Sequence, residues 1–168
     1  KVGTALKDVA ADSLGAFVVK EIVARTGIDP ERVDEVIVGN AGMPAEAANI
    51  GRVIALRAGI PQRVPAYSVQ RNCASGMQAI ASAYGQITAG LSEIVLVAGV
   101  ESMSNFGFYT TKRLKDIFTR IGRSKSFWGK AAAALSIRPK DLMPVVGLTL
   151  GLTDPISGLN MGQTAENL

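Results

Sequence analysis

The chain has 168 residues, of which 48% are hydrophobic and 19% are charged. This composition is typical of one well-packed globular domain and excludes disorder throughout the chain. The single cysteine and the lack of histidine exclude an internal disulfide framework and a multi-cysteine metal site, and we predict no metal. We therefore expect a protein of a reducing compartment, either the cytoplasm or an organellar matrix.

No apolar run reaches the roughly 18–20 residues that a membrane-spanning helix needs, so we expect a soluble protein. The sequence begins Lys1-Val2-Gly3 without a methionine or a signal-peptide pattern, and we expect that a beginning has been lost. The net charge is +4, and most of the excess lies in one segment, between residues 112 and 130. Because the charge is local, we predict no nucleic-acid partner.

The first predicted helix begins at Asp12 or Ser13, either of which suits the cap position, and Gly27 is suited to end it. It is expected to be an ordinary amphipathic surface helix with an apolar stripe of Leu14, Phe17, Val18 and Ile22. A short helical turn is predicted to start at Asp29 and Pro30.

Short apolar segments then alternate with helical ones. Residues 35–38 and 65–69 predict strands, and residues 93–99 predict a strand covered on both faces because their apolar run does not alternate. A helix is predicted over residues 47–58. Another is predicted after Asn72, which suits its cap, and its many alanines indicate close packing on nearly all sides. The alternation predicts a largely parallel α/β sheet.

Beyond Glu101 no clear strand is expected, and glycines and prolines interrupt the sequence, so residues 101–168 are predicted to be an excursion from the α/β core. Its first part has one acid, Asp116, among seven basic residues: Lys112, Arg113, Lys115, Arg120, Arg123, Lys125 and Lys130. The same part carries an apolar stripe of Leu114, Ile117, Phe118 and Ile121, closely followed by Phe127 and Trp128. Peripheral contact with a membrane surface is one interpretation of this pattern. A solvated helix face is the simpler one, because no second anchor is visible.

The only cysteine, Cys73, stands between a predicted strand and a predicted helix. Free N–H groups and the dipole at a helix start favour the thiolate, which is the form that attacks carbonyl carbon. This effect is about 0.3–1 kcal/mol, so most of the thiol stays protonated at neutral pH and a second activator, normally histidine, is wanted. From position alone, a nucleophile and a buried apolar cysteine are both open interpretations.

The neighbouring residues resemble the acyl-enzyme segment of thiolases. The resemblance rests on Asn72-Cys73-Ala74-Ser75-Gly76-Met77-Gln78-Ala79-Ile80, followed by Ala89-Gly90 and Val97-Ala98-Gly99-Val100-Glu101-Ser102-Met103-Ser104. Further landmarks occur in thiolase order: Leu6-Lys7-Asp8-Val9, Gly27-Ile28-Asp29-Pro30, Val33-Asp34-Glu35-Val36-Ile37-Val38-Gly39-Asn40, Ala58-Gly59-Ile60-Pro61, Gly151-Leu152-Thr153-Asp154-Pro155 and Met161-Gly162-Gln163-Thr164-Ala165-Glu166-Asn167.

The resemblance covers nearly the whole chain and implies the N-terminal half of a thiolase, cut short at both ends. Residues 1–100 correspond to the N-terminal α/β core without its first strand, and residues 101–168 correspond to an incomplete loop domain. The implied fold is α/β, the N-terminal half of a layered α-β-α-β-α architecture with a mostly irregular or helical insertion.

The resemblance also implies a mechanism, in which Cys73 accepts an acyl group from an acyl-CoA as a thioester and passes it on, making or cleaving a 3-ketoacyl-CoA. Acyl-CoA and coenzyme A are then substrates, no separate cofactor is expected, and a homo-oligomer (dimer or tetramer) is implied. Some basic residues of the excursion are expected to contact CoA phosphate. Met161 falls where thiolases place a methionine beside the acyl pocket, and Asn160, in place of a histidine found in many short-chain thiolases, favours a longer acyl chain.

The sequence departs from the family in one respect. Thiolases use two histidines and a second cysteine from their C-terminal half, and these 168 residues contain no histidine and one cysteine. The residues are therefore expected to be part of a longer polypeptide, or else to pair with another chain. The alternative function is a non-catalytic thiolase-fold scaffold that binds CoA or another chain. A ketosynthase relative fits less well, because the residues after Cys73 look like thiolase.

Overall fold

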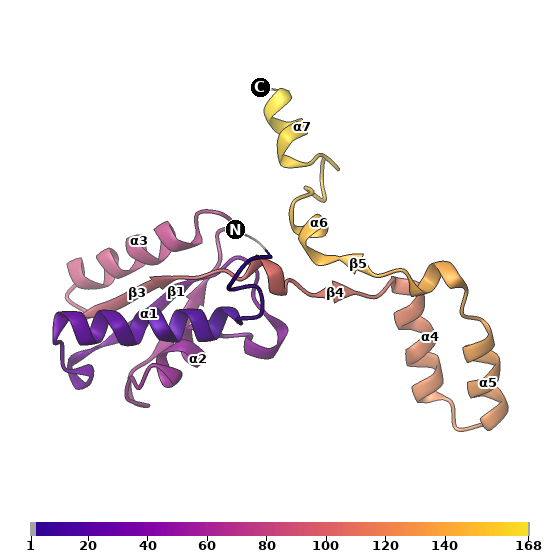
Figure 1. The fold of residues 1–168 in the computed structure, drawn as a ribbon, viewed down its shortest axis with the longest axis horizontal. Coiled ribbons are helices and arrows are strands. Elements are labelled where there is room, and N and C mark those ends of the chain that lie inside the picture. Colours follow the sequence, from indigo (N-terminus) through magenta and orange to yellow (C-terminus); the bar gives the residue numbers. More distant parts are fainter. Residues whose placement is uncertain (1–2, 168) are drawn as a thin grey trace. The chain divides into compact units, whose positions relative to one another are not determined.

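The computed structural model describes residues 3–167, which form two compact units. The first unit ends at Asn105 and the second begins at Phe106, whereas the sequence predicts a boundary at about Glu101. The first unit is a sheet with helices on both faces, and the second consists of helices and a short two-stranded ribbon (Figure 1). The identification of the second unit with a thiolase loop domain stays a prediction.

The sheet of the first unit has three parallel strands, as the sequence predicts. Strand β1 (Glu35–Gly39) lies at the centre, between β2 (Ala66–Val69) and β3 (Val95–Gly99). Four of the five residues of β1 are buried. The strand predicted to be covered on both faces is β3, but β3 lies at the edge of the sheet and most of its residues are only half-buried. The prediction is confirmed for its two faces, since Val95 and Val97 pack against the hydrophobic cluster on one face and Leu96 and Ala98 against the cluster on the other. Its free edge has no neighbouring strand among residues 3–167.

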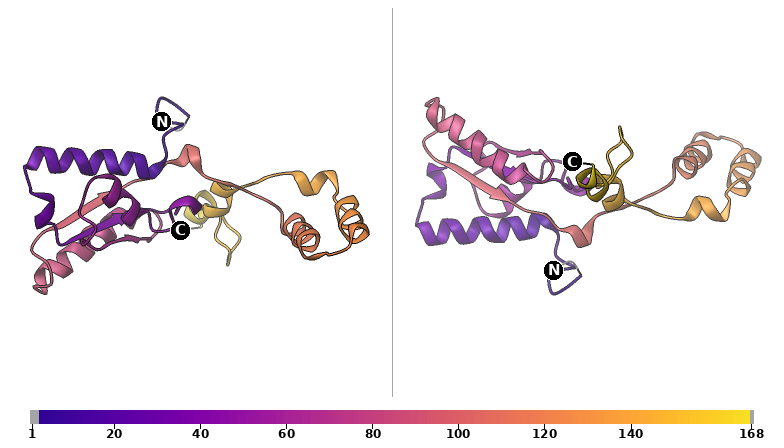
Figure 2. Two further views of the ribbon diagram at one scale, coloured as in Figure 1. Left: turned by 90° about the horizontal axis from the view of Figure 1, so that it is seen from below. Right: turned by 90° about the horizontal axis from the view of Figure 1, so that it is seen from above.

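Helices cover both faces of this sheet. Helices α1 and α2 lie on one face and α3 on the other (Figures 1 and 2). Alternate residues of β1 serve the two faces, since Val36 and Val38 pack toward α1 and α2 while Ile37 packs against α3. The elements are α1 (Ala11–Thr26), α2 (Ile50–Arg57), α3 (Ser75–Thr88) and the 3₁₀ turns η1 (Pro30–Arg32), η2 (Ala45–Ala47) and η3 (Met103–Asn105).

Helix α1 packs through its small residues, so the predicted apolar stripe is wrong. Ala11, Gly15 and Val19 are buried, whereas Phe17 and Val18 are exposed. The reason lies in α2, because the side chain of Ile54 occupies the space that a Cβ at Gly15 would need. Only the small-residue face of α1 can approach α2 this closely.

The predicted cap of α1 is also wrong, although its predicted end is confirmed. Ala10 precedes the helix, and Asp12 is buried in an ion pair with Arg57 of α2 at 2.8 Å. Gly27 ends the helix with a φ of 66°, in the left-handed region. Asp29 caps the turn η1 as predicted, by accepting the N–H of Glu31.

Helix α3 is packed on one side only, which contradicts the prediction of close packing on nearly all sides. Ala79 and Ala83 are buried against the sheet. The opposite face exposes a row of large apolar side chains that no other residue of the first unit covers: Met77, Ile80, Tyr84 and Ile87.

The second unit is built on a helical hairpin. Helices α4 (Lys112–Arg123) and α5 (Phe127–Leu135) lie side by side (Figures 1 and 2), with Leu114, Ile117 and Ala133 buried. The expectation that this region has no strand is wrong for two short pieces, because Phe108–Tyr109 (β4) and Val145–Val146 (β5) pair in antiparallel fashion. The remaining elements are η4 (Pro139–Leu142), α6 (Gly147–Gly151) and α7 (Met161–Glu166). Within residues 3–167, no helix has the length and apolar character needed to cross a membrane.

Two neighbouring carboxylates at the start of β1 differ in their surroundings. Asp34 accepts the N–H groups of Ile94 and Glu93 at 2.9 and 2.8 Å, and these hydrogen bonds lower the pKa of Asp34 below its ordinary value of 3.8. Glu35 has one buried carboxylate oxygen without a hydrogen-bond partner in the described chain, and burial raises the pKa of Glu35 above its ordinary value of 4.5.

We expect Asp34→Asn to destabilise the fold at neutral pH and Glu35→Gln to stabilise it. The contribution of ionised Asp34 is present above its unfolded-state pKa and is lost as the pH falls through the lowered folded-state pKa. The effect of Glu35 on stability has the opposite sign. Its ionised form destabilises the fold, and this destabilisation develops as the pH rises from the unfolded-state pKa to the raised folded-state pKa. Urea unfolding midpoints at about pH 7 and about pH 3 measure both effects, which should shrink at the lower pH. Midpoints equal to that of the unmodified protein at neutral pH would contradict this account.

Candidate functional site

The carboxyl ends of the three parallel strands lie together at one end of the sheet, which we call its carboxyl edge. Gly39, the last residue of β1, is level with Val69 of β2 and Gly99 of β3. The loops that follow these strands therefore leave from the same edge. This is the edge at which open α/β sheets bind their ligands.

Cys73 lies at this edge on a tight turn between β2 and α3, and its side chain is exposed. The turn is made by Asn72, whose φ of 49° is in the left-handed region that asparagine tolerates better than most residues. Asn72 is therefore not the helix cap predicted from the sequence, since the residue before α3 is Ala74. The exposure of Cys73 in this structure also argues against its interpretation as a buried apolar residue.

The hydroxyl of Ser75 fastens this turn. Ser75 is buried, and its Oγ accepts the N–H of Arg71 at 2.8 Å and donates to the carbonyl of Asn72 at 2.6 Å. Two backbone hydrogen bonds tighten the same segment, from Ala74 N–H to the Arg71 carbonyl and from Ser75 N–H to the Asn72 carbonyl. The backbone on both sides of Cys73 is thus held by neighbours. A role for Ser75 was not predicted from the sequence.

Glycines at the strand ends let α3 begin directly against the sheet. A Cβ at Gly39 would lie 2.5 Å from backbone atoms of Ser75 and Gly76, and a Cβ at Gly99 would lie 3.6 Å from the Cα of Gly76. The first turn of α3 therefore rests on the end of β1. The position of the Cys73 turn depends on this contact.

Backbone donors remain available beside the thiol. No hydrogen bond from the N–H of Cys73 or of Gly76 reaches another residue of the described chain. These N–H groups lie at the start of α3, where the helix dipole favours negative charge. The turn is thus suited to stabilise an anionic oxygen next to the sulfur.

A second polar cluster braces the loop that follows β1. Asn40 is buried, and its amide donates to the Val100 carbonyl at 2.7 Å and to Glu101 at 3.2 Å. The other oxygen of Glu101 accepts the N–H groups of Ala41 and Gly42 at 2.9 and 3.1 Å. The cluster joins the ends of β1 and β3. Asn40 directly follows β1 and Glu101 comes two residues after β3, positions that could have pointed to this role.

Met161, the predicted acyl-pocket residue, belongs to the second unit and is the first residue of α7, with an exposed side chain. Asn160 caps this helix, since its Oδ1 accepts the N–H of Gln163 at 2.9 Å and the Gln163 side chain accepts the N–H of Asn160 at 3.0 Å. A substrate contact of Met161 stays a prediction.

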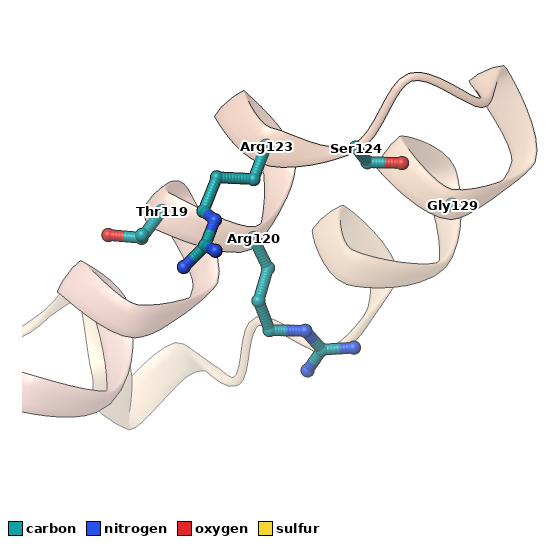
Figure 3. Close-up of a pocket in the computed structure, with 5 residues that line it drawn as sticks. All are labelled: Thr119, Arg120, Arg123, Ser124 and Gly129. Atoms are coloured by element: carbon teal, nitrogen blue, oxygen red, sulfur yellow. The ribbon is translucent and has the colours of Figure 1, made fainter.

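The second unit also has an open depression of about 440 Å³ on the hairpin, lined by Thr119, Arg120, Arg123, Ser124 and Gly129. Figure 3 shows the side chains of Thr119, Arg120 and Arg123, with the two guanidinium groups extending in different directions. Neither arginine has a carboxylate partner among the described residues, whereas Arg113 is paired with buried Asp141 at 3.1 Å. The depression is therefore an anion-attracting surface.

No group of three or more His, Cys, Asp or Glu side chains suited to hold a metal ion is found within residues 3–167.

A protein-family model described as "Thiolase, N-terminal domain" matches residues 1–168. The chain belongs to the thiolase N-terminal domain family. This confirms the resemblance seen around Cys73.

Curated relatives carry matching names. The chain is 35% identical over 168 residues to a 3-ketoacyl-CoA thiolase of Aeromonas salmonicida, and the match covers 100% of this chain and 38% of that protein. It is 34% identical over 166 residues to a probable acetyl-CoA acyltransferase of Staphylococcus aureus, with 99% of this chain and 37% of that protein covered. This thiolase family member thus spans little more than a third of the length of these relatives.

Solved structures confirm the predicted thiolase-like α/β fold. The acetyl-CoA acetyltransferase of Bacillus anthracis matches with a TM-score of 0.79 and 37% identity, over 99% of this chain and 37% of that one. Acat5 thiolase from Ascaris suum, solved in complex with coenzyme A, matches with a TM-score of 0.78 and 28% identity, over 99% of this chain and 38% of that one.

We expect Gly39→Ala to destabilise the fold by about 1–3 kcal/mol, because the added methyl group meets the backbone of α3. Gly85→Ala, within α3 itself, is the matched control. Nothing lies within 4 Å of a Cβ there, so alanine should stabilise the helix by up to about 1 kcal/mol. Urea denaturation measures both changes, and a neutral Gly39→Ala would show that α3 does not rest on β1.

Proposed function

We propose that this chain carries the nucleophile of a thiolase-type acyl transfer, and that Cys73 takes the acyl group from an acyl-CoA. The single observation that carries the proposal is the exposed thiol on a fastened turn at the ligand-binding edge of the sheet, with free N–H groups beside it. Membership of the thiolase family and the names of the relatives support it.

In the proposed step, the sulfur of Cys73 attacks the thioester carbonyl carbon of an acyl-CoA. The bond between that carbon and the CoA sulfur breaks, a thioester forms on Cys73, and the thiol proton ends on the sulfur of the released CoA. The N–H of Cys73 is a candidate donor to the oxygen that becomes negative in the transition state. Coenzyme A takes part as a substrate, so the step needs no separate cofactor.

Proton transfer in thiolases uses histidine and a second cysteine, and the 168 residues contain no histidine and one cysteine. We propose that the base that activates Cys73 comes from a further part of the protein or from a partner. The uncovered apolar face of α3 is where we propose that this part packs. We also propose that the protein forms a homo-oligomer and lies in the cytoplasm or an organellar matrix.

A non-catalytic scaffold is the second candidate, and the lack of histidine is the observation that favours it. Such a scaffold would bind acyl-CoA reversibly without forming a bond to it. The two candidates therefore differ in one measurable product, the acyl thioester.

We expect the protein that contains these residues to gain one acyl group from acyl-CoA, on the peptide that carries Cys73. Intact-mass and peptide mass spectrometry detect the adduct, and hydroxylamine should release it because it is a thioester. Cys73→Ser should abolish this thioester. An adduct on another residue, or an equal amount after Cys73→Ser, would overturn the assignment. Residues 1–168 alone are expected to complete no cleavage of 3-ketoacyl-CoA.

We also propose that Arg120 and Arg123 contact a phosphate of CoA. A guanidinium group matches phosphate geometry with two parallel hydrogen bonds, and these two lack a carboxylate partner among the described residues. Both line the depression on the hairpin. The other exposed basic residues of the hairpin are not part of this proposal.

We expect Arg120→Gln and Arg123→Gln each to weaken CoA binding by about two- to fivefold, the range typical of an exposed charge pair. Binding of pantetheine, which lacks the phosphates, should not change. Lys140→Gln, at an exposed basic residue outside the depression, is the control and should leave both affinities unchanged. Calorimetric titration gives the dissociation constants of CoA and of pantetheine for each protein, and an equal loss for CoA and pantetheine would contradict a phosphate contact.

A further inference from the structure

Helix α5 exposes an apolar face that packing within the hairpin leaves uncovered. Trp128 and Leu135 are 78% and 87% exposed and lie two helical turns apart, on one face of the helix. Phe127 is also exposed, and its ring meets that of Trp128 edge-to-face with centroids 5.6 Å apart. Clustered exposed apolar side chains of this kind mark a surface that contacts something other than water.

This face differs from the apolar stripe predicted from the sequence. Leu114 and Ile117 of that stripe are buried in the hairpin, and Ile121 is half-buried. They join α4 to α5, so they are not free to contact a membrane. Phe118 is the member of the stripe that stays exposed. The exposed face of α5 is therefore the anchor that the sequence pattern lacked.

The hairpin that carries this face is strongly basic. Between residues 112 and 130 the hairpin has seven basic residues and one acid, and Lys125 and Lys130 flank Phe127 and Trp128 in the sequence. Arg113 is neutralised by Asp141. The other six basic side chains have no carboxylate partner in the described part of the chain. The hairpin thus combines exposed aromatic rings with unpaired cations.

We propose that the α4–α5 hairpin docks on the surface of an anionic lipid bilayer. Phe127, Trp128 and Leu135 enter the boundary between headgroups and acyl chains, where amphipathic rings are favoured. Lys125 and Lys130 contact the anionic headgroups. A second copy of the hairpin is a poor occupant of this face, because it would bring the same unpaired positive charge.

The chain offers its own reporter, because Trp128 is its only tryptophan. We expect the full chain to float with vesicles that contain phosphatidylglycerol and to remain in solution with vesicles of phosphatidylcholine alone. The emission of Trp128 should shift to the blue on binding and should be quenched by brominated lipid. Raising the salt concentration should weaken binding, because the headgroup contacts are screened.

Leu135→Ser should lower the partition coefficient by about tenfold, since it removes a side chain that the bilayer would bury. Ile156→Ser is the matched control, because Ile156 is 94% exposed in the same unit but lies outside the hairpin, so its partition coefficient should not change. Both sites are exposed, and circular dichroism verifies that the variants fold. The proposal is overturned if anionic vesicles do not bind the chain, or if the two variants behave alike. A blue shift that follows protein concentration without lipid would identify a second copy as the occupant instead.

Discussion

The contact between Gly39 and the first turn of α3 is the constraint on which the Cys73 turn depends. With no side chain at the end of β1, the backbone of Ser75 and Gly76 lies directly against the strand. The chain then has only a few residues in which to pass from β2 to α3, and it does so through the left-handed conformation of Asn72. The exposure of Cys73 therefore follows from the path of the backbone and the clamp of Ser75, rather than from contacts of the thiol itself.

The two loops at this edge of the sheet differ in how their backbone donors are used. Glu101 accepts the N–H groups of Ala41 and Gly42, so the loop after β1 is already satisfied. The N–H of Cys73 has no such acceptor within residues 3–167. A ligand with an anionic or carbonyl oxygen gains hydrogen bonds at the Cys73 turn, whereas at the neighbouring loop it would have to displace Glu101. The loop that carries Cys73 therefore has backbone donors available to a ligand, whereas the donors of the loop after β1 are already paired.

The sequence was sufficient for the parts of the fold that local patterns determine. Alternating helix and strand predicts the parallel sheet, and Gly27 predicts the end of α1, because period and turn chemistry are local properties. The buried face of α1 could not be predicted, since it depends on Ile54 meeting Gly15 across the fold. Asn72 was misassigned because asparagine favours both helix caps and left-handed turns. The bond of Asn40 to Glu101 joins residues far apart in the sequence, which one sequence does not reveal.

The uncovered apolar faces of α3 and α5 differ in charge, and this difference favours different partners for them. Helix α3 contains no charged residue, and its exposed Met77, Ile80 and Tyr84 resemble a surface that protein normally buries. The chain spans only 38% of the length of a curated relative. Burial of this face by residues from the remaining length of such a protein agrees with that coverage. Helix α5 instead has its aromatic rings in a segment whose lysines lack carboxylate partners among the described residues, and a protein that covered this segment would bury unpaired cations at a high cost in desolvation. A lipid surface avoids that cost, because the same cations stay at the hydrated headgroups while the rings leave water.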